Sequence, residues 1–307
     1  MDYKKLIFIA ALLASASSLV PAPAALVGGF ILANTIGNPY RELSSHYTSL
    51  LLKASVVGLG FGMNMAEALM VGRDGAILTA FSITFVLSFG AIVGYYMGIP
   101  RRLSHLVSSG TAICGGSAIA AVAPAVKATA SETSISLGVI FLLNSIALLI
   151  FPPLGHLLSL DEHQFGMWCA MAIQDTSSVV GAASAYGEQA LMVATTVKLA
   201  RALWIIPVSL ISIVLFRSGA KKISFPWFIL LFIVAMAAAS YIPIVGLAGG
   251  YIFKLSKVLL VVTLFLIGSS LSVSSIKEVG VKPLALAVIL WVAISLLSLT
   301  AILYIYK

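Results

Sequence analysis

The chain has 307 residues, of which 61% are hydrophobic and only 9% are charged. A soluble domain of this length needs more polar surface than these residues supply, so the composition excludes a soluble protein. The formal charge of +8 includes no basic stripe interleaved with aromatic residues, which argues against nucleic-acid binding.

Charged residues and Pro/Gly breaks divide the chain into apolar segments of roughly membrane length, joined by short loops. This pattern predicts an all-α polytopic membrane protein with about 10–11 transmembrane helices. It also predicts one transmembrane domain over residues 1–307, without a soluble domain. The expected spans are 6–20, 23–36, 46–71, 75–98, 104–123, 133–158, 164–186, 191–216, 225–245, 253–272 and 283–305.

The first segment has the features of a cleavable signal peptide, because Lys4 and Lys5 precede an apolar run and small residues. Its apolar character continues into the second segment, so we expect an uncleaved first helix, with removal of residues 1–16 as the alternative. Cys114 and Cys169 lie inside expected spans, which predicts buried thiols rather than a disulfide framework.

The distribution of basic residues predicts how the chain crosses the membrane. If the N-terminus is cytoplasmic, loops on that side hold ten of the 18 basic residues, and the opposite loops and the C-terminus hold only Arg73, Lys127 and Lys307. We therefore expect a cytoplasmic N-terminus and an outer C-terminus. The ten are Lys4, Lys5, Arg41, Arg101, Arg102, Arg217, Lys221, Lys222, Lys277 and Lys282.

Two Gly-rich segment ends share a layout at a constant offset of 208 residues, pairing Gly60 with Gly268 and Asn64 with Ser272. Counting spans places the two units, 60–72 and 268–280, in opposite orientations. Inverted repeats of this kind are typical of secondary transporters. Chance resemblance between two Gly/Ser-rich helix ends is the alternative.

The span 104–123 contains Gly110, Gly115 and Gly116 and is followed by Pro124, so it is a poor continuous helix. Within a membrane, a broken helix requires cover from protein or from a water-filled cavity. The amino end of its second half would bind anions. The alternative is a face of small residues for helix packing. The candidate substrate-binding residues here are Thr111, Ile113, Cys114, Gly115, Gly116 and Ser117.

The span 164–186 carries Asp175, which lies 13 residues from both Glu162 and Glu188. At 1.5 Å per residue, Asp175 is roughly 20 Å from either end, near the membrane midplane. An ionisable group at this depth marks a functional site, so we expect Asp175 to couple transport to H⁺ or Na⁺. The neighbouring candidate substrate-binding residues are Gln174, Thr176, Ser177 and Ser178, whose alternative role is ordinary helix packing.

The span 191–216 carries Lys198 and Arg201, which are three residues apart and share one helix face. They could neutralise Asp175, receive an anionic substrate or line a lateral vestibule. Asn144, in the span 133–158, is interpreted as an amide that bridges helices and is left out of the site.

Three long motifs in the correct order carry a resemblance: SGTAICGGSAIAAVAPAV, FGMWCAMAIQDTSSVVGAA and VKLARALWIIPV. Together they resemble a family of bacterial membrane proteins that was first grouped as uncharacterised conserved hypothetical proteins and later labelled sulfate exporters. The resemblance implies an inner-membrane secondary transporter, similar in organisation to bile-acid symporters and cation–proton antiporters. In such proteins a core bundle with two crossed helices moves against a scaffold. That family tends to have His where this chain has Gln174, which argues against a His–Asp proton pair here.

The sequence therefore predicts an elevator-type secondary transporter of a small anion, coupled to H⁺ or Na⁺, with its core bundle around 104–123 and 164–186. A channel is the alternative. An intramembrane enzyme is less favoured, because no second carboxylate lies at the depth of Asp175 and no His/Cys/carboxylate cluster has metal-ligand spacing. We expect no cofactor other than bound Na⁺ or H⁺. The expected partners are the anionic substrate, the lipid bilayer and a second copy of the chain in a homodimer.

Overall fold

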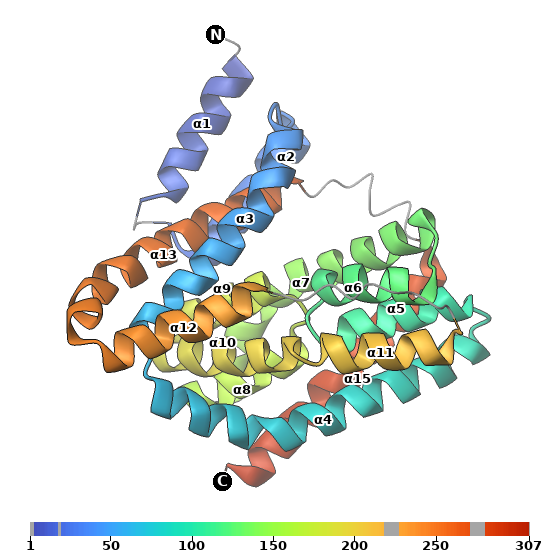
Figure 1. The fold of residues 1–307 in the computed structure, drawn as a ribbon. Coiled ribbons are helices and arrows are strands. Elements are labelled where there is room, and N and C mark those ends of the chain that lie inside the picture. Colours follow the sequence, from blue (N-terminus) through green and yellow to red (C-terminus); the bar gives the residue numbers. More distant parts are fainter. Residues whose placement is uncertain (1–2, 18–19, 218–226, 271–279, 307) are drawn as a thin grey trace. The chain divides into compact units, whose positions relative to one another are not determined.

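The computed structural model describes residues 3–17, 20–217, 227–270 and 280–306, and this described part is helical with no strand (Figure 1). Among these residues, five helical segments are long and apolar enough to cross a membrane, and one bent pair would make a sixth. Other predicted spans consist of shorter helices that meet at breaks. The predicted all-α polytopic fold is confirmed.

The chain divides into two compact units. Unit 1 comprises Met1–Met70 and Trp227–Ser274, and unit 2 comprises Val71–Pro226 and Ser275–Lys307. The helices of unit 1 are α1 (Tyr3–Ser15), α2 (Ala22–Thr35), α3 (Arg41–Leu59), the short 3₁₀ helix η1 (Gly60–Gly62), α12 (Trp227–Tyr241) and α13 (Pro243–Ser270).

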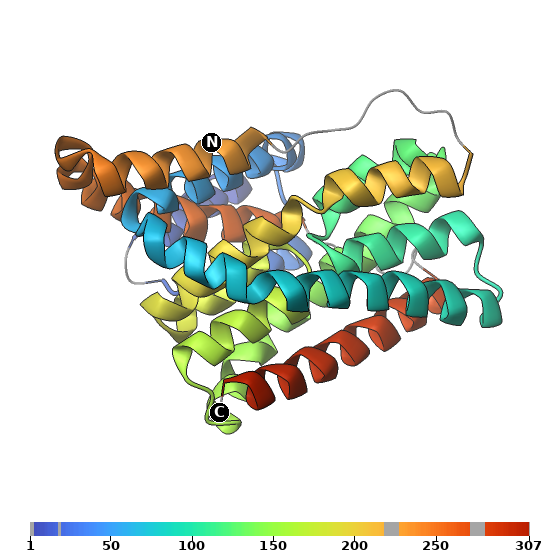
Figure 2. The ribbon, with the colours of Figure 1, turned by 60° about the horizontal axis from the view of Figure 1, so that its bottom comes forward.

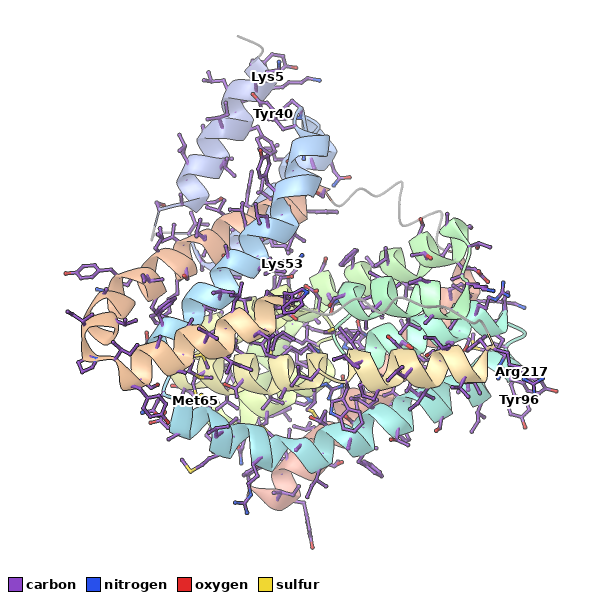
Figure 3. All side chains as sticks on the ribbon, viewed as in Figure 1. Lys5, Tyr40, Lys53, Met65, Tyr96 and Arg217 are labelled. Carbon is purple, nitrogen blue, oxygen red and sulfur yellow. The ribbon has the colours of Figure 1, made fainter. Side chains whose placement is uncertain are left out.

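In unit 1, α13 packs along α2 and α3, and α1 rests on α13 through an aromatic cluster. The ring of Phe8 lies 5.4 Å from the ring of Phe265 and 5.6 Å from that of Tyr40, which Figure 3 labels. Ring pairs at this separation stabilise a contact beyond the apolar area that they bury. The first apolar segment is therefore a helix packed into unit 1.

The contact between α2 and α13 depends on glycines at which the two backbones approach closely. A Cβ atom added at Gly29 would lie 2.9 Å from the backbone N of Ser269, whereas one added at Gly28 would meet nothing within 4 Å. Gly268 of α13 lies equally close to α2, because a Cβ atom added there would lie 3.0 Å from the backbone N of Phe30. Small residues allow this approach between membrane helices.

We expect Gly29→Ala to lower the free energy of unfolding by about 1–3 kcal/mol, because the added methyl group would push two backbones apart. Gly28→Ala is the matched control, one residue away on the same helix. It should be neutral or stabilising by up to about 1 kcal/mol, because alanine favours helix over glycine. Thermal unfolding of both variants in detergent checks the pair, and equal melting temperatures would contradict the close approach.

The break that separates the third and fourth spans lies earlier than predicted. The sequence placed it at 72–74, but α4 (Met65–Tyr96) runs without interruption through these residues. The helical stretches Leu50–Gly62 and Met65–Arg73 instead meet at 110°. Asn64 explains the position, because its Oδ1 accepts hydrogen bonds from the backbone N–H groups of Ala66 (2.8 Å) and Glu67 (3.4 Å). It therefore caps the start of α4.

The break between the ninth and tenth predicted spans, which the structure forms as α12 and α13, also lies earlier than predicted. The sequence placed it among the residues between 245 and 253, which include three glycines, but α13 begins at Pro243 and continues through them. Proline suits the first position of a helix, because its missing N–H has no partner there in any case. The proline therefore marks the boundary, and the glycines lie inside the helix.

Within its described residues, unit 2 contains the remainder of α4 and eight further helices. Figure 2 shows the ribbon from a second direction. Near its far end α4 packs against α5 and α15, and the Oγ atom of Ser104 donates a hydrogen bond to the backbone O of Gly90 at 3.0 Å. The helices are α5 (Arg101–Ala112), α6 (Gly116–Val126), α7 (Ala130–Leu157), α8 (Glu162–Ala172), α9 (Thr176–Tyr186), α10 (Glu188–Ala202), α11 (Ile205–Leu215) and α15 (Val281–Ile305).

The predicted inverted repeat cannot be traced in full, because residues 271–279 lie outside the described residues. Ser272 belongs to that segment. The part of the second copy that is described, up to Ser270, continues α13. The pseudo-two-fold relation between 60–72 and 268–280 therefore stays a prediction.

Candidate functional site

Two predicted spans are broken helices, and their breaks meet inside unit 2. The first span is α5 followed by α6, with residues 113–115 between them, and the second is α8 followed by α9, with residues 173–175 between them. Gly115 has a φ of +63°, and a Cβ atom added to it would lie 3.3 Å from the Cα of Asp175. Only glycine fits both this backbone conformation and this approach. The two breaks therefore lie against each other.

A buried cation from α10 donates hydrogen bonds to backbone carbonyls at the carboxyl end of each of α5 and α8. The Nζ atom of Lys198 donates to the backbone O of Ile173 at 2.7 Å and to that of Ala170 at 3.3 Å. Arg201 donates to the backbone O of Ala112, the last residue of α5. The last carbonyls of a helix lack partners within it and carry partial negative charge. Lys198 and Arg201 therefore satisfy and neutralise the two half-helix carboxyl ends.

Arg201 also joins the two broken spans to α4. Its Nη1 atom lies 3.1 Å from the Oγ of Ser82 and 2.7 Å from the Sδ of Met171. Both cations are completely buried, with 0% exposure. The sequence suggested that the two cations neutralise Asp175, receive an anionic substrate or line a vestibule. In the structure they contact backbone carbonyl and side-chain atoms of the protein instead. No ion pair joins either cation to Asp175 within the described residues.

Asp175 stands at the opposite, amino end of α9 and serves as its N-cap. Its Oδ2 atom accepts hydrogen bonds from the backbone N–H of Ser177, at 3.0 Å, and from the Ser177 hydroxyl. A carboxylate is favoured at this position by the unpaired N–H groups and by the helix dipole. The amino end of α6 differs, because its N-cap residue is Gly115, which provides no side chain.

Two carboxamides at the second break are buried and only partly satisfied. Asn144 of α7 accepts with its Oδ1 from the backbone N–H groups of Gln174 (2.9 Å) and Asp175 (3.1 Å), while its Nδ2 has no partner. Both polar atoms of the Gln174 side chain also lack partners. The exposed fractions are 2% for Asn144 and 1% for Gln174. Buried amides without partners are costly, so these groups indicate a place for a ligand or water.

Asn144 is the site residue that the sequence interpretation left out. It does connect helices, as interpreted. Its Oδ1 atom accepts from the backbone N–H groups of Gln174 and Asp175, at the break between α8 and α9. A polar amide in an otherwise apolar span was the available signal. What the sequence could not show is which of the other spans lies opposite the amide.

The other candidate residues of the first break make contacts within the chain. The hydroxyl of Thr111 donates within its own helix to the backbone O of Val107 at 2.9 Å, and Ile113 follows the end of α5. The Sγ of Cys114 lies 2.9 Å from the Oγ of Ser117, the second residue of α6. At the second break, Thr176, Ser177 and Ser178 form the buried first turn of α9.

Two candidate residues came from the predicted helix-break repeat. Asn64 belongs to unit 1, where it caps α4, and Ser272 lies outside the described residues.

Membrane-length apolar helices and two broken helices that meet in the interior define an all-α polytopic membrane protein. More particularly, residues 5–287 match the sequence model of the family described as conserved hypothetical protein 698, and the chain belongs to that family. The resemblance drawn from the three motifs is thereby confirmed as to family.

Several curated relatives carry the name UPF0324 membrane protein. One from Bacteroides thetaiotaomicron is 50% identical over 295 residues, which cover 94% of this chain and 88% of the relative. One from Vibrio parahaemolyticus is 48% identical over 305 residues and covers 98% of both chains. One from Geobacter sulfurreducens is 46% identical over 278 residues, covering 91% of this chain and 89% of the relative. No solved structure matches.

Proposed function

We propose that the protein is a secondary active transporter that moves a small anionic solute across the bacterial inner membrane and couples this movement to H⁺ or Na⁺. One observation carries the proposal: two broken helices meet at Gly115 and Asp175, with a buried cation on the carboxyl end of each first half. Broken helices of this kind are used by secondary transporters to hold substrate and coupling ion near the midplane.

The distribution of charge at the crossing supports an anionic substrate. Lys198 and Arg201 neutralise the partial negative charge at the carboxyl ends of α8 and α5. The partial positive charge at the amino ends of α6 and α9 therefore remains. Of these two amino ends, only that of α9 has an acidic N-cap, Asp175, because the N-cap of α6 is Gly115. Backbone N–H groups at such helix ends bind anions.

Asp175 is the residue that we assign to ion coupling. It lies at the break, partly buried, and its carboxylate accepts only from Ser177 within the described residues. A carboxylate at this depth must be protonated, hydrated or bound to a cation when the site changes its access. Either H⁺ or Na⁺ could meet that requirement.

An elevator mechanism is the form of alternating access that we propose. Both broken helices belong to unit 2, which would be the transporting core, and unit 1 would be the scaffold. The bias of basic residues supports a cytoplasmic N-terminus and an outer C-terminus. A homodimer formed through unit 1 belongs to the same proposal.

Transport into proteoliposomes tests the proposal. Purified protein is reconstituted, and uptake of radiolabelled sulfate and of small carboxylates and sulfonates is measured with and without imposed pH and Na⁺ gradients. We expect one of these anions to accumulate above its external concentration when a gradient is present. Flux that only equalises concentrations would indicate a channel, and chemical alteration of the anion would indicate an enzyme.

A further inference from the structure

We propose that the amino end of α9 is a shared oxyanion site, at which the Asp175 carboxylate and an external oxyanion compete for the same donors. Protonation of Asp175 then frees the donors, so the anion and H⁺ bind together. The inference rests on the proposed transport function. It goes further by naming the ligand as a small oxyanion, such as a carboxylate, sulfonate or sulfate, and by assigning H⁺ as the coupling ion with cotransport as its direction.

The competition follows from the contacts of one carboxylate oxygen. Oδ2 of Asp175 accepts from both the backbone N–H and the hydroxyl of Ser177, two of the donors in the first turn of α9. An ionised acceptor holds such donors much more strongly than a neutral one. When Asp175 binds a proton it loses that advantage, and an external oxyanion can take its place at the positive end of the helix.

The unpartnered amides show that the break offers more donors than Asp175 uses. Nδ2 of Asn144 is bonded to the same carbon as the Oδ1 atom that accepts from Gln174 and Asp175, so this free donor also lies at the break. The Gln174 amide adds a second unpartnered NH₂ group, directly before Asp175. A sulfonate has three acceptor oxygens and a sulfate has four, so either ion could accept from these unpartnered NH₂ groups as well as from Ser177.

An external oxyanion binds poorly while the Asp175 carboxylate is ionised. Two unit negative charges about 4 Å apart repel strongly in a protein interior. We therefore expect ionised Asp175 to weaken oxyanion binding on the order of a hundred-fold or more.

Other ionisable groups lie at the two breaks or on the helices that contact them, and their titration has to be separated from that of Asp175 in the test. They are Lys198 and Arg201 on α10, Cys114 at the first break and Cys169 on α8. Both cations are held by backbone carbonyls, and both thiols are buried. A pH dependence that comes from any of these groups will persist when Asp175 is replaced by a residue that does not titrate.

Chemical rescue by acetate tests the site without knowledge of the natural substrate. Asp175→Ala, purified in detergent at about pH 8, is expected to gain about 3 °C or more in Tm with acetate over chloride at equal ionic strength. Acetate would occupy the place of the missing carboxylate. Asp161→Ala is the matched control, because Asp161 is the N-cap of α8, where it accepts from the backbone N–H of Gln164, and is exposed. In Asp161→Ala, bulk water can reach this exposed helix end in place of the carboxylate, so acetate should have no specific effect there.

A pH series on the wild type keeps the inference testable should Asp175→Ala fail to fold. Stabilisation by sulfate, which stays ionised throughout, is measured between about pH 5 and pH 8. We expect it to grow as the pH falls in the wild type and to be independent of pH in Asp175→Asn.

The results separate this inference from the proposed function. Absence of acetate rescue in a folded Asp175→Ala variant would overturn the shared site, and so would sulfate stabilisation that ignores pH in the wild type or keeps its pH dependence in Asp175→Asn. Gradient-driven anion uptake in proteoliposomes would leave the transport function standing in each of those cases. Conversely, rescue without any transport would support the site and contradict the transporter.

Discussion

Replacement of Lys198 by methionine is expected to lower the free energy of unfolding by about 3 kcal/mol. The change keeps much of the side-chain volume but leaves the backbone O atoms of Ala170 and Ile173 without their donor. Each buried carbonyl without a partner costs about 1–3 kcal/mol. Removal of the buried charge offsets part of this loss, because the ammonium group was itself desolvated.

The measurement is thermal unfolding in detergent, with Lys53→Met as the matched control. Lys53 lies on α3, where Figure 3 labels it, and its side chain is exposed, so its replacement should change the stability by less than about 0.5 kcal/mol. Equal melting temperatures for the two variants would show that the end of α8 does not need its cation. Lys198 would then be available to contact the substrate, which was one of its alternative roles.

The location of the candidate site could be predicted from the sequence, because its signals are local. Gly110, Gly115 and Gly116 weaken one helix, and Asp175 stands alone in another, so each break was visible without knowledge of the packing. The pairing of Lys198 and Arg201 on one face followed from helical spacing. Their targets did not, because the sequence does not specify which helix ends lie against α10.

Errors in the helix boundaries have a common physical origin. Arg73 and the glycines before residue 253 were taken as breaks because polar and flexible residues are frequent between spans. The real boundaries are set by capping at Asn64 and by the start of a helix at Pro243. These effects act on backbone N–H groups, and hydropathy does not detect them.

Replacement of Asp175 by asparagine is expected to abolish the dependence of transport on the ion gradient while the protein stays folded. Asparagine is about as good an N-cap as aspartate, and it can still accept from Ser177, so the free energy of unfolding should change by less than about 1 kcal/mol. Had Asp175 formed an ion pair with Lys198 or Arg201, the same change would have cost roughly 3–5 kcal/mol. Both cations contact carbonyl oxygens instead.

The deciding experiment measures gradient-driven anion flux in proteoliposomes beside Tm in detergent, for Asp175→Asn and for Asp161→Asn. Asp161 caps α8 and is exposed, so its variant makes the same chemical change in the same unit and should keep both stability and coupling. Asparagine cannot exchange a proton, and it binds a cation more weakly than a carboxylate does. Anion movement in Asp175→Asn should therefore follow the anion's own gradient alone. Wild-type coupling in a stable Asp175→Asn protein would remove Asp175 from the mechanism, and a large loss of stability would assign it a structural role.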